Sequence, residues 1–274
     1  MEAPAAVRYW HLLSFDAPTV AVVWSLSFAW IAGARLPMWL LALQALVVWT
    51  VYVGDRLLDA RKGLRERDGE GLRERHFFHW RHRATLTPLA MMASLGSALI
   101  ALHWMPVGAK ERSSVLGAAS LAYFARVHSA GAGTRLKRFA TKELLVGVLF
   151  TIGCALPAWS RGVDGWAVSA AAAYFAWLAW LNCEAIEEWE SGTGCSGILR
   201  KAGWFAALGC VGAALMAGLD ARAAAMLAAG AASALLLGML DSMRGRLTAV
   251  LLRAAADLVL LTPALVLAVH WVRR

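Results

Sequence analysis

Charged residues are scarce in this chain: Asp, Glu, Lys and Arg make up 16% of its 274 residues, against about 25% in an ordinary soluble domain. Hydrophobic residues make up 60% of the chain, which includes 14 tryptophans. This composition excludes an ordinary soluble domain and indicates a membrane protein.

Cysteine is scarce as well, and no pair has the spacing of metal ligands. We therefore expect neither a disulfide framework nor a zinc site, and we interpret the cysteines as small apolar side chains. The first residues also lack a basic start followed by an apolar core, so no cleavable signal peptide is predicted and the first apolar segment is expected to be retained. The cysteines are Cys154, Cys183, Cys195 and Cys210.

Apolar segments recur along the whole length of the chain. Most approach the ~20 residues that a helix needs to cross ~30 Å of hydrocarbon, although the fourth is short. Abundant Ala and Gly would let such helices pack closely in lipid. The sequence predicts an all-α, polytopic membrane protein, a bundle of about nine transmembrane helices forming a single domain over residues 1–274. The nine segments are 16–33, 37–58, 84–104, 113–127, 139–160, 165–189, 202–219, 222–241 and 247–271.

Lysine and arginine are distributed unevenly between the two faces that nine spans would create. The face that includes the N-terminus carries 19 of them, and the opposite face carries 7. Because positive residues accumulate in short cytoplasmic loops, we expect the N-terminus to be cytoplasmic. The net charge of +9 then has the lipid bilayer as its nearest partner, and no nucleic-acid role is needed.

Two clusters of acidic residues end the second and the sixth apolar segments. The first, in "YVGDRLLDARKG", contains Asp55 and Asp59, four residues apart. The second, in "LNCEAIEEWESG", contains Asn182, Glu184, Glu187, Glu188 and Glu190. Three segments separate the two helices, so both acidic ends are expected on the cytoplasmic face.

Carboxylates three or four residues apart project side by side from a helix and repel each other, and the C-terminal end of a helix disfavours negative charge. A divalent cation would remove both penalties, and carboxylates are suitable ligands for Mg²⁺. The alternative is structural: Asp55 and Asp59 cap the loop or pair with neighbouring basic residues, and the glutamates form a solvated helix end.

Basic residues precede the fifth segment in "GTRLKRFATKELLVG", on the same predicted face as the acids. Arginine and lysine bind diphosphate through charge-assisted hydrogen bonds. Ordinary cytoplasmic loop charge is the alternative explanation. The residues are Arg135, Lys137, Arg138 and Lys142.

Three segments of the chain resemble the UbiA superfamily of intramembrane prenyltransferases. "VYVGDRLLD" resembles the motif N-D-x-x-D-x-x-x-D that ends helix 2 of the family; it keeps Asp55 and Asp59, and it has Val51 and Tyr52 in place of Asn and Asp. The second motif has glutamates where the family has aspartates. "RLKRFATKELLVGVLFTIGCALPAW" resembles the helix 5 segment of the family, which begins with Lys-Arg.

This resemblance implies Mg²⁺-dependent alkylation of an aromatic or other lipophilic acceptor by a polyprenyl diphosphate. Ionisation of the diphosphate requires metal ions and basic side chains to stabilise the leaving group. Lys137 and Arg138, helped by Arg56, would bind the diphosphate. Tyr52 and Trp180 are close enough in sequence to the motifs to face the carbocation by cation–π attraction; ordinary packing or a position at the membrane interface is the alternative for each. The predicted catalytic residues are Asp55, Asp59, Glu184 and Glu188, and the predicted metal ligands are these four with Glu187.

Two other functions stay open at this point. The replaced Asn and Asp of the first motif are compatible with an intramembrane terpene cyclase that acts without an acceptor, or with a non-catalytic or transport protein on the same fold. Residues 59–83, long and mixed in charge, are expected to be a cytoplasmic loop, either a helical lid over the site or a solvated excursion.

Overall fold

The computed structural model describes residues 3–65, 72–129, 139–161, 165–191 and 197–272. These residues contain α-helices and one short 3₁₀ helix and no strand, which confirms the predicted all-α class. The helices are α1 (Ala5–Leu12), α2 (Asp16–Ile31), α3 (Met38–Arg65), α4 (Glu74–Arg81), α5 (Arg83–Trp104), α6 (Val107–Ser129), α7 (Phe139–Trp159), α8 (Gly165–Ser191), α9 (Ile198–Ala217), α10 (Ala221–Met243), η2 (Arg244–Arg246), α11 (Ala249–Val259) and α12 (Thr262–Val272).

Each predicted apolar segment falls on one of the long helices or, for the last segment, on α11 with α12. By length and composition, four described stretches could cross a membrane: Met38–Leu64, Arg83–Trp104, Ile198–Ala217 and Ala221–Arg246. The bent pairs α1/α2 and α11/α12 raise this number to six if each pair is one span. The described part of the chain thus has the features of a helical membrane protein, and nine spans remain a prediction.

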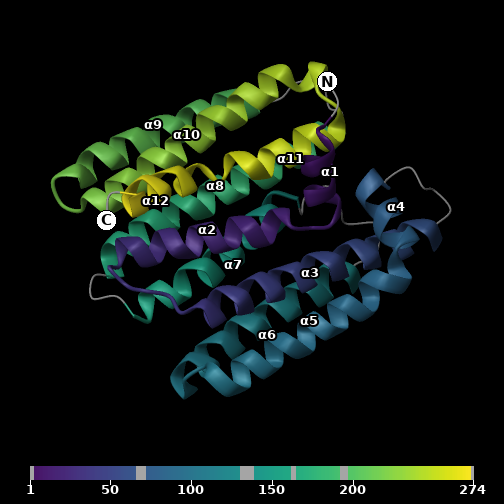
Figure 1. Ribbon diagram of the computed structural model, residues 1–274. Helices are drawn as coiled ribbons and strands as arrows, with labels where there is room; N and C mark the ends of the chain where they lie inside the picture. Colours follow the sequence, from purple (N-terminus) through teal and green to yellow (C-terminus); the bar gives the residue numbers. More distant parts are fainter. Residues whose placement is uncertain (1–2, 66–71, 130–138, 162–164, 192–196, 273–274) are drawn as a thin grey trace.

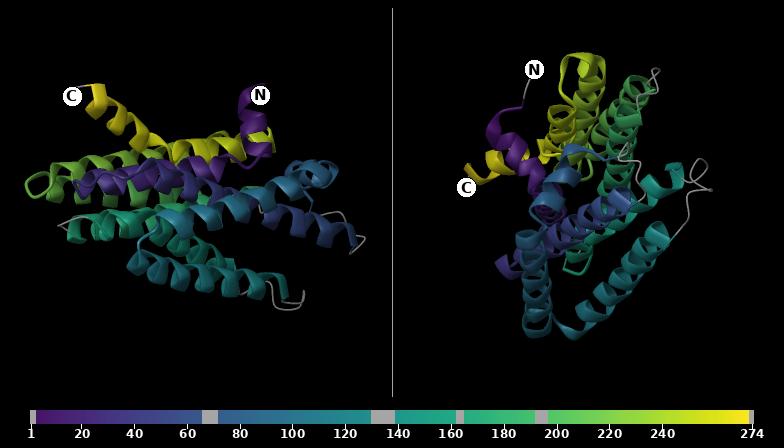
Figure 2. Two further views of the ribbon diagram at one scale, coloured as in Figure 1. Left: turned by 60° about the horizontal axis from the view of Figure 1, so that its bottom comes forward. Right: turned by 90° about the vertical axis from the view of Figure 1, so that its right-hand side faces the viewer.

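The long helices lie side by side in one bundle (Figure 1). Helices α9 and α10 form a hairpin along one edge, α3, α5 and α6 lie along the other, and α2, α7 and α8 lie between them. Two further views show the same arrangement (Figure 2). The short helices α1 and α4 contact each other at the end of the bundle where α3 ends and α11 begins.

Aromatic rings and small residues fill the middle of the bundle. Trp24 on α2 stacks on Phe175 of α8, with ring centroids 3.8 Å apart, and its indole N–H donates to the carbonyl oxygen of Leu260 at 3.0 Å. At Gly147, a Cβ atom would lie 3.0 Å from the carbonyl oxygen of Ala176. Helices α7 and α8 can therefore approach closely because glycine stands at their contact, as is common in lipid.

The chain turns sharply between α1 and α2, whose axes differ by 87°. Ser14 forms this joint with a positive φ of 62°, a conformation that costs free energy for a residue other than glycine. Ser14 is fully buried. The surrounding contacts must therefore hold the joint, and they are polar.

The predicted loop 59–83 contains helical structure. Helix α3 continues to Arg65, residues 66–71 lie outside the described residues, and α4 covers Glu74–Arg81. Helix α4 packs against α1, α3 and α5, so the described part of this segment is folded onto the bundle. Its role as a lid stays a prediction.

Candidate functional site

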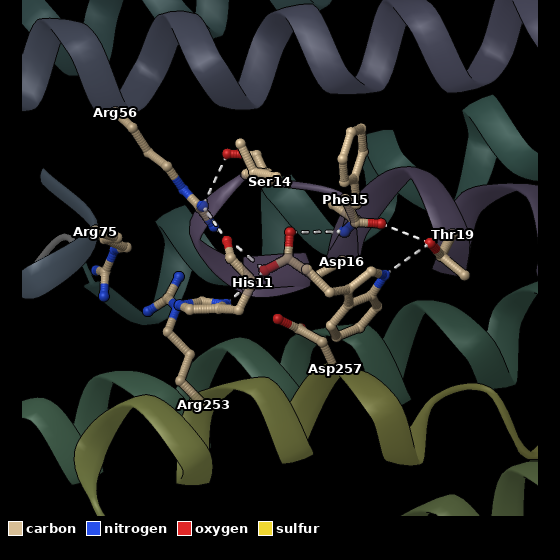
Figure 3. Close-up of polar contacts among 12 residues, drawn as sticks. His11, Ser14, Phe15, Asp16, Thr19, Arg56, Arg75, Arg253 and Asp257 are labelled. Carbon is tan, nitrogen blue, oxygen red and sulfur yellow. Dashed lines mark hydrogen bonds and ion pairs between the residues drawn. The ribbon is translucent and has the colours of Figure 1, made fainter. Parts of the chain in front are cut away.

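A network of buried polar side chains holds the joint between α1 and α2 (Figure 3). We call His11, Ser14, Asp16, Arg56 and His79 the joint network. Arg56 reaches it from α3: its guanidinium donates to the His11 carbonyl oxygen at 2.9 Å, the Ser14 hydroxyl at 2.8 Å and the Asp16 carboxylate at 3.3 Å. His11 Nδ1 lies 2.7 Å from the same carboxylate. Each charge in this network has a partner within the protein, as buried charges require.

The direction of the hydrogen bonds fixes the protonation of His79 on α4. Its Nδ1 lies 2.8 Å from the carbonyl oxygen of Arg75, which can only accept, so Nδ1 carries the proton. Its Nε2 therefore accepts from the Ser14 hydroxyl, 3.1 Å away. Burial lowers the pKa of His79 to about 4, which agrees with a neutral ring. The neutral His79 thus connects α4 to the joint by a hydrogen bond with Ser14.

A second cluster joins α4, α8 and α11 next to this joint. Glu190, at the end of α8, accepts from Arg75 at 2.6 and 3.1 Å and from Arg253 of α11 at 2.9 Å. Burial would raise the pKa of Glu190, but the hydrogen bonds and charges of the two arginines outweigh burial and lower this pKa to about 2. Glu190 is therefore a structural anion that ties three helices together.

Asp257 of α11 faces Asp16 across the same region (Figure 3). Its carboxylate accepts from the side-chain amide of Asn182 on α8 at 3.1 Å. Ligand atoms of His11, Asp16 and Asp257 lie within 4.8 Å of one another, and this is the one such group of three among the described residues. Arg56 and His11 already donate to Asp16, so the network is held together by its own hydrogen bonds.

The predicted carboxylates lie in the C-terminal part of α3. Asp55 and Asp59 are half-buried. Asp55 lies within electrostatic reach of the Tyr123 hydroxyl on α6, together with Glu143 of α7 and Cys183 of α8. The Tyr123 hydroxyl is buried and has no hydrogen-bond partner among the residues that the structure describes. Ionisable side chains of α3, α7 and α8 therefore act on the Tyr123 hydroxyl.

The glutamates at the end of α8 point in different directions. Glu184 forms an ion pair with Lys201 of α9, Glu190 joins the arginines described above, Glu187 is exposed and Glu188 is half-buried. Successive residues of a helix are rotated by about 100°, so consecutive glutamates cannot all face α3. Within the predicted set on α8, Glu187 and Glu188 form no side-chain ion pair with the described part of the chain, whereas Glu184 does.

Other predicted site residues have specific surroundings. Arg56, predicted to bind diphosphate, is buried in the joint network, and its phosphate contact stays a prediction. Tyr52 lies beside it, with the guanidinium 6.0 Å from the ring centre. Trp180 packs edge-on against Trp177 and lies 5.8 Å from the Lys201 ammonium. Lys137 and Arg138 lie outside the described residues.

The sequence interpretation missed most of the joint network. Asp16 carried a signal, because a carboxylate at the start of an apolar segment is expensive in a membrane unless it has a partner. Its partners, His11 and Arg56, lie on helices that only the fold brings together. Comparison of the chain with family models, with curated proteins and with solved structures found no match.

Proposed function

We propose that this protein is an integral, multi-pass membrane enzyme that transfers a prenyl group from a polyprenyl diphosphate to a lipophilic, for example aromatic, acceptor with Mg²⁺. In this proposal the chain has nine spans, and its N-terminus and site face the cytoplasm. The observation that supports it most is the half-buried position of Asp55 on α3, whose carboxylate acts electrostatically on the Tyr123 hydroxyl of α6, as do Glu143 of α7 and Cys183 of α8. Carboxylates at such a depth are a functional hypothesis by default.

The donor set fits Mg²⁺. Asp55 and Asp59 stand one helical turn apart on α3, and their oxygens are hard ligands that leave room for water and phosphate oxygens around the ion. Glu187 and Glu188 of α8 would supply further oxygens. Glu184, also in the proposed set, would have to break its ion pair with Lys201 in order to bind the metal. When bound, Mg²⁺ would stabilise the negative charge of the diphosphate leaving group.

The chain itself would position the two ends of the substrate. In the transfer, the bond from the allylic carbon to the diphosphate oxygen breaks, a bond from that carbon to the acceptor forms, and the acceptor loses a proton. Lys137 and Arg138 would bind the diphosphate through charge-assisted hydrogen bonds. Tyr52 and Trp180 would place π-electrons near the developing cation, and the apolar bundle would hold the isoprenoid tail away from water.

Release of diphosphate tests this proposal. Purified protein in detergent receives geranyl, farnesyl or geranylgeranyl diphosphate with Mg²⁺ and a panel of aromatic acceptors. We expect turnover in the wild type and a loss of at least about 100-fold in Asp55→Asn, because one preorganised group that stabilises the transition state contributes about that much. The control is Glu111→Gln on α6, an exposed carboxylate, which should leave turnover unchanged.

The products separate this proposal from its alternatives. Prenylated acceptor, with no turnover until acceptor is added, supports transfer. Hydrocarbon or alcohol formed without acceptor would overturn transfer in favour of terpene cyclisation. If Asp55→Asn leaves the Mg²⁺-dependent binding of prenyl diphosphate unchanged, or if the wild type binds none, the result overturns transfer in favour of a non-catalytic protein on this fold.

A further inference from the structure

A groove lies along α3 and α5. Its volume is about 420 Å³, and its walls are mainly apolar or small side chains of the two helices. Met91, on one wall, is 68% exposed, so the groove opens sideways to the surroundings of the bundle. In Figures 1 and 2, α3 and α5 lie side by side along one edge of the molecule.

Positive charge is confined to one end of this groove. Arg61 near the end of α3 and Arg83 at the start of α5 both line it. Arg83 is held by Trp80: its guanidinium donates to the Trp80 carbonyl oxygen at 2.8 Å and lies 4.5 Å from the ring centre. Arg61 is exposed and has no hydrogen bond or ion pair with any described residue. The groove therefore has two cations and an aromatic ring at one end, and an apolar channel beyond them.

The length of the groove matches one leaflet of a bilayer. Arg61 and Thr50 mark its two ends on α3 and lie eleven residues apart, which is roughly 16 Å of helix. Half of a hydrocarbon core of ~30 Å is about the same length. Both helices are candidate membrane spans. A molecule with a phosphate at one end and an acyl chain of one leaflet's depth would fit this shape and charge.

We propose that this groove binds an anionic phospholipid, with its phosphate between Arg61 and Arg83 and one acyl chain along α3 and α5. Two arginines favour a headgroup with net negative charge over a zwitterionic one, whose ammonium they would repel. With the phosphate between the two arginines, Trp80 would lie at headgroup depth, where tryptophan is enriched in membrane proteins. The site does not depend on the proposed enzymatic activity, and the leaflet it faces is cytoplasmic if the proposed orientation holds.

Gly54 provides a way to block the groove without disturbing the fold. It lines the groove, and a Cβ atom built there meets no other atom within 4 Å. Gly54→Leu should therefore fill the acyl channel. Gly203 on α9 is the matched control, because it is also helical with open space around its Cβ. Arg200→Gln, at an exposed arginine of α9, is the control for Arg61→Gln.

Native mass spectrometry of the detergent-purified protein measures the binding. Equal amounts of phosphatidylglycerol and phosphatidylcholine are added, and we expect the phosphatidylglycerol adduct to dominate. Arg61→Gln should weaken that adduct about fivefold, the effect of one cation at a membrane surface. Gly54→Leu should weaken it at least as much, while Gly203→Leu and Arg200→Gln leave it unchanged.

Any one of three results would overturn the proposal. The first is that phosphatidylcholine binds as well as phosphatidylglycerol, and the second is that both groove variants bind phosphatidylglycerol like the wild type. The third is that farnesyl diphosphate displaces the lipid from the groove. If Gly54→Leu fails to fold, Arg61→Gln still decides, because its exposed side chain contributes no protein contact that folding needs.

Discussion

The joint network and the acidic ends of α3 and α8 lie at the same end of the bundle but balance their charge differently. At the joint, Asp16 and Arg56 are almost completely buried and are paired with each other. At the end of α8, Glu184 and Lys201 are paired while each is about a third exposed. The first arrangement holds helices together, because a buried charge that loses its partner is costly. The second leaves carboxylates within reach of solvent and of a cation.

The largest effect is expected at Arg56. Arg56→Leu leaves the Asp16 carboxylate buried with one cation fewer, so the free energy of unfolding should fall by about 3–5 kcal/mol. Circular dichroism during thermal unfolding in detergent measures it, with Arg200→Leu as an exposed control. Adding Asp16→Asn to Arg56→Leu should recover part of the loss. Unfolding of Arg56→Leu at the wild-type temperature would contradict the role given to the network.

The contact of α7 with α8 near the proposed site should be the next most sensitive. Gly147→Ala places a Cβ 3.0 Å from the Ala176 carbonyl oxygen, so the helices must separate, at a cost of about 1–3 kcal/mol. At Gly153 on the same helix, the nearest atom would be 3.8 Å away. Gly153→Ala should be neutral or slightly stabilising, because Ala favours helix over Gly. Equal unfolding temperatures for the two variants would refute the close approach.

Acid should destabilise the joint and the Glu190 cluster in separate pH ranges. An unfolded histidine has an ordinary pKa of about 6.5, whereas that of buried His79 is about 4. Between these values the unfolded chain binds a proton that the folded chain does not, so stability falls as the pH drops from 6.5 to 4. Glu190, with its pKa lowered from 4.5 to about 2, loses its contribution as the pH drops through that lower range.

Two variants test which residue causes the loss of stability in each pH range. The free energy of unfolding is measured as a function of pH for each variant. In the upper range, His79→Gln should reduce the slope of the free energy of unfolding against pH by up to about 1.4 kcal/mol per pH unit, the effect of one proton. Glu190→Gln should flatten the lower range. His82→Gln, at an exposed histidine, is the control and should leave both ranges as in the wild type. An upper range that persists unchanged in His79→Gln would show that another group causes it.

The smallest effect is expected at the Glu184–Lys201 pair. Because both side chains are partly exposed, Lys201→Met should change the free energy of unfolding by less than about 1 kcal/mol. The same thermal unfolding experiment measures it. If Lys201→Met lowered the free energy of unfolding as much as Arg56→Leu, the two regions would not differ in how their charges contribute to stability.

Local patterns were sufficient to place the helices but not their partners. The apolar segments predicted α3 and α5 closely, because a run of apolar residues long enough for a bilayer has few other structures available. The sequence did not predict that α1 turns at Ser14, and for 59–83 it left a helical lid and a solvated excursion open without deciding that 74–81 form a helix packed on the bundle. Both depend on contacts between residues more than 40 positions apart, such as Arg56 with Ser14.

The acidic residues at the end of α8 contact different neighbouring helices. "LNCEAIEEWESG" was interpreted as one acidic cluster, but Glu184 turns to Lys201 and Glu190 turns to Arg75 and Arg253. Sequence spacing states which residues share a helix face; it does not state which neighbouring helix that face meets. Asp55 and Asp59 are half-buried near the end of α3, and their role as metal ligands stays a prediction.

The amino-acid sequence by itself determined the helical class, the apolar character of the bundle and the gathering of acidic residues at two helix ends, since these follow from composition and periodicity along the chain. The tertiary structure alone decided that Arg56 belongs to a buried joint rather than to open solvent, and that Arg61 and Arg83 flank one groove. The physical reason is that the free energy of a charge depends on its burial and on its partners. For these arginines, both are set by helices that are distant in the sequence.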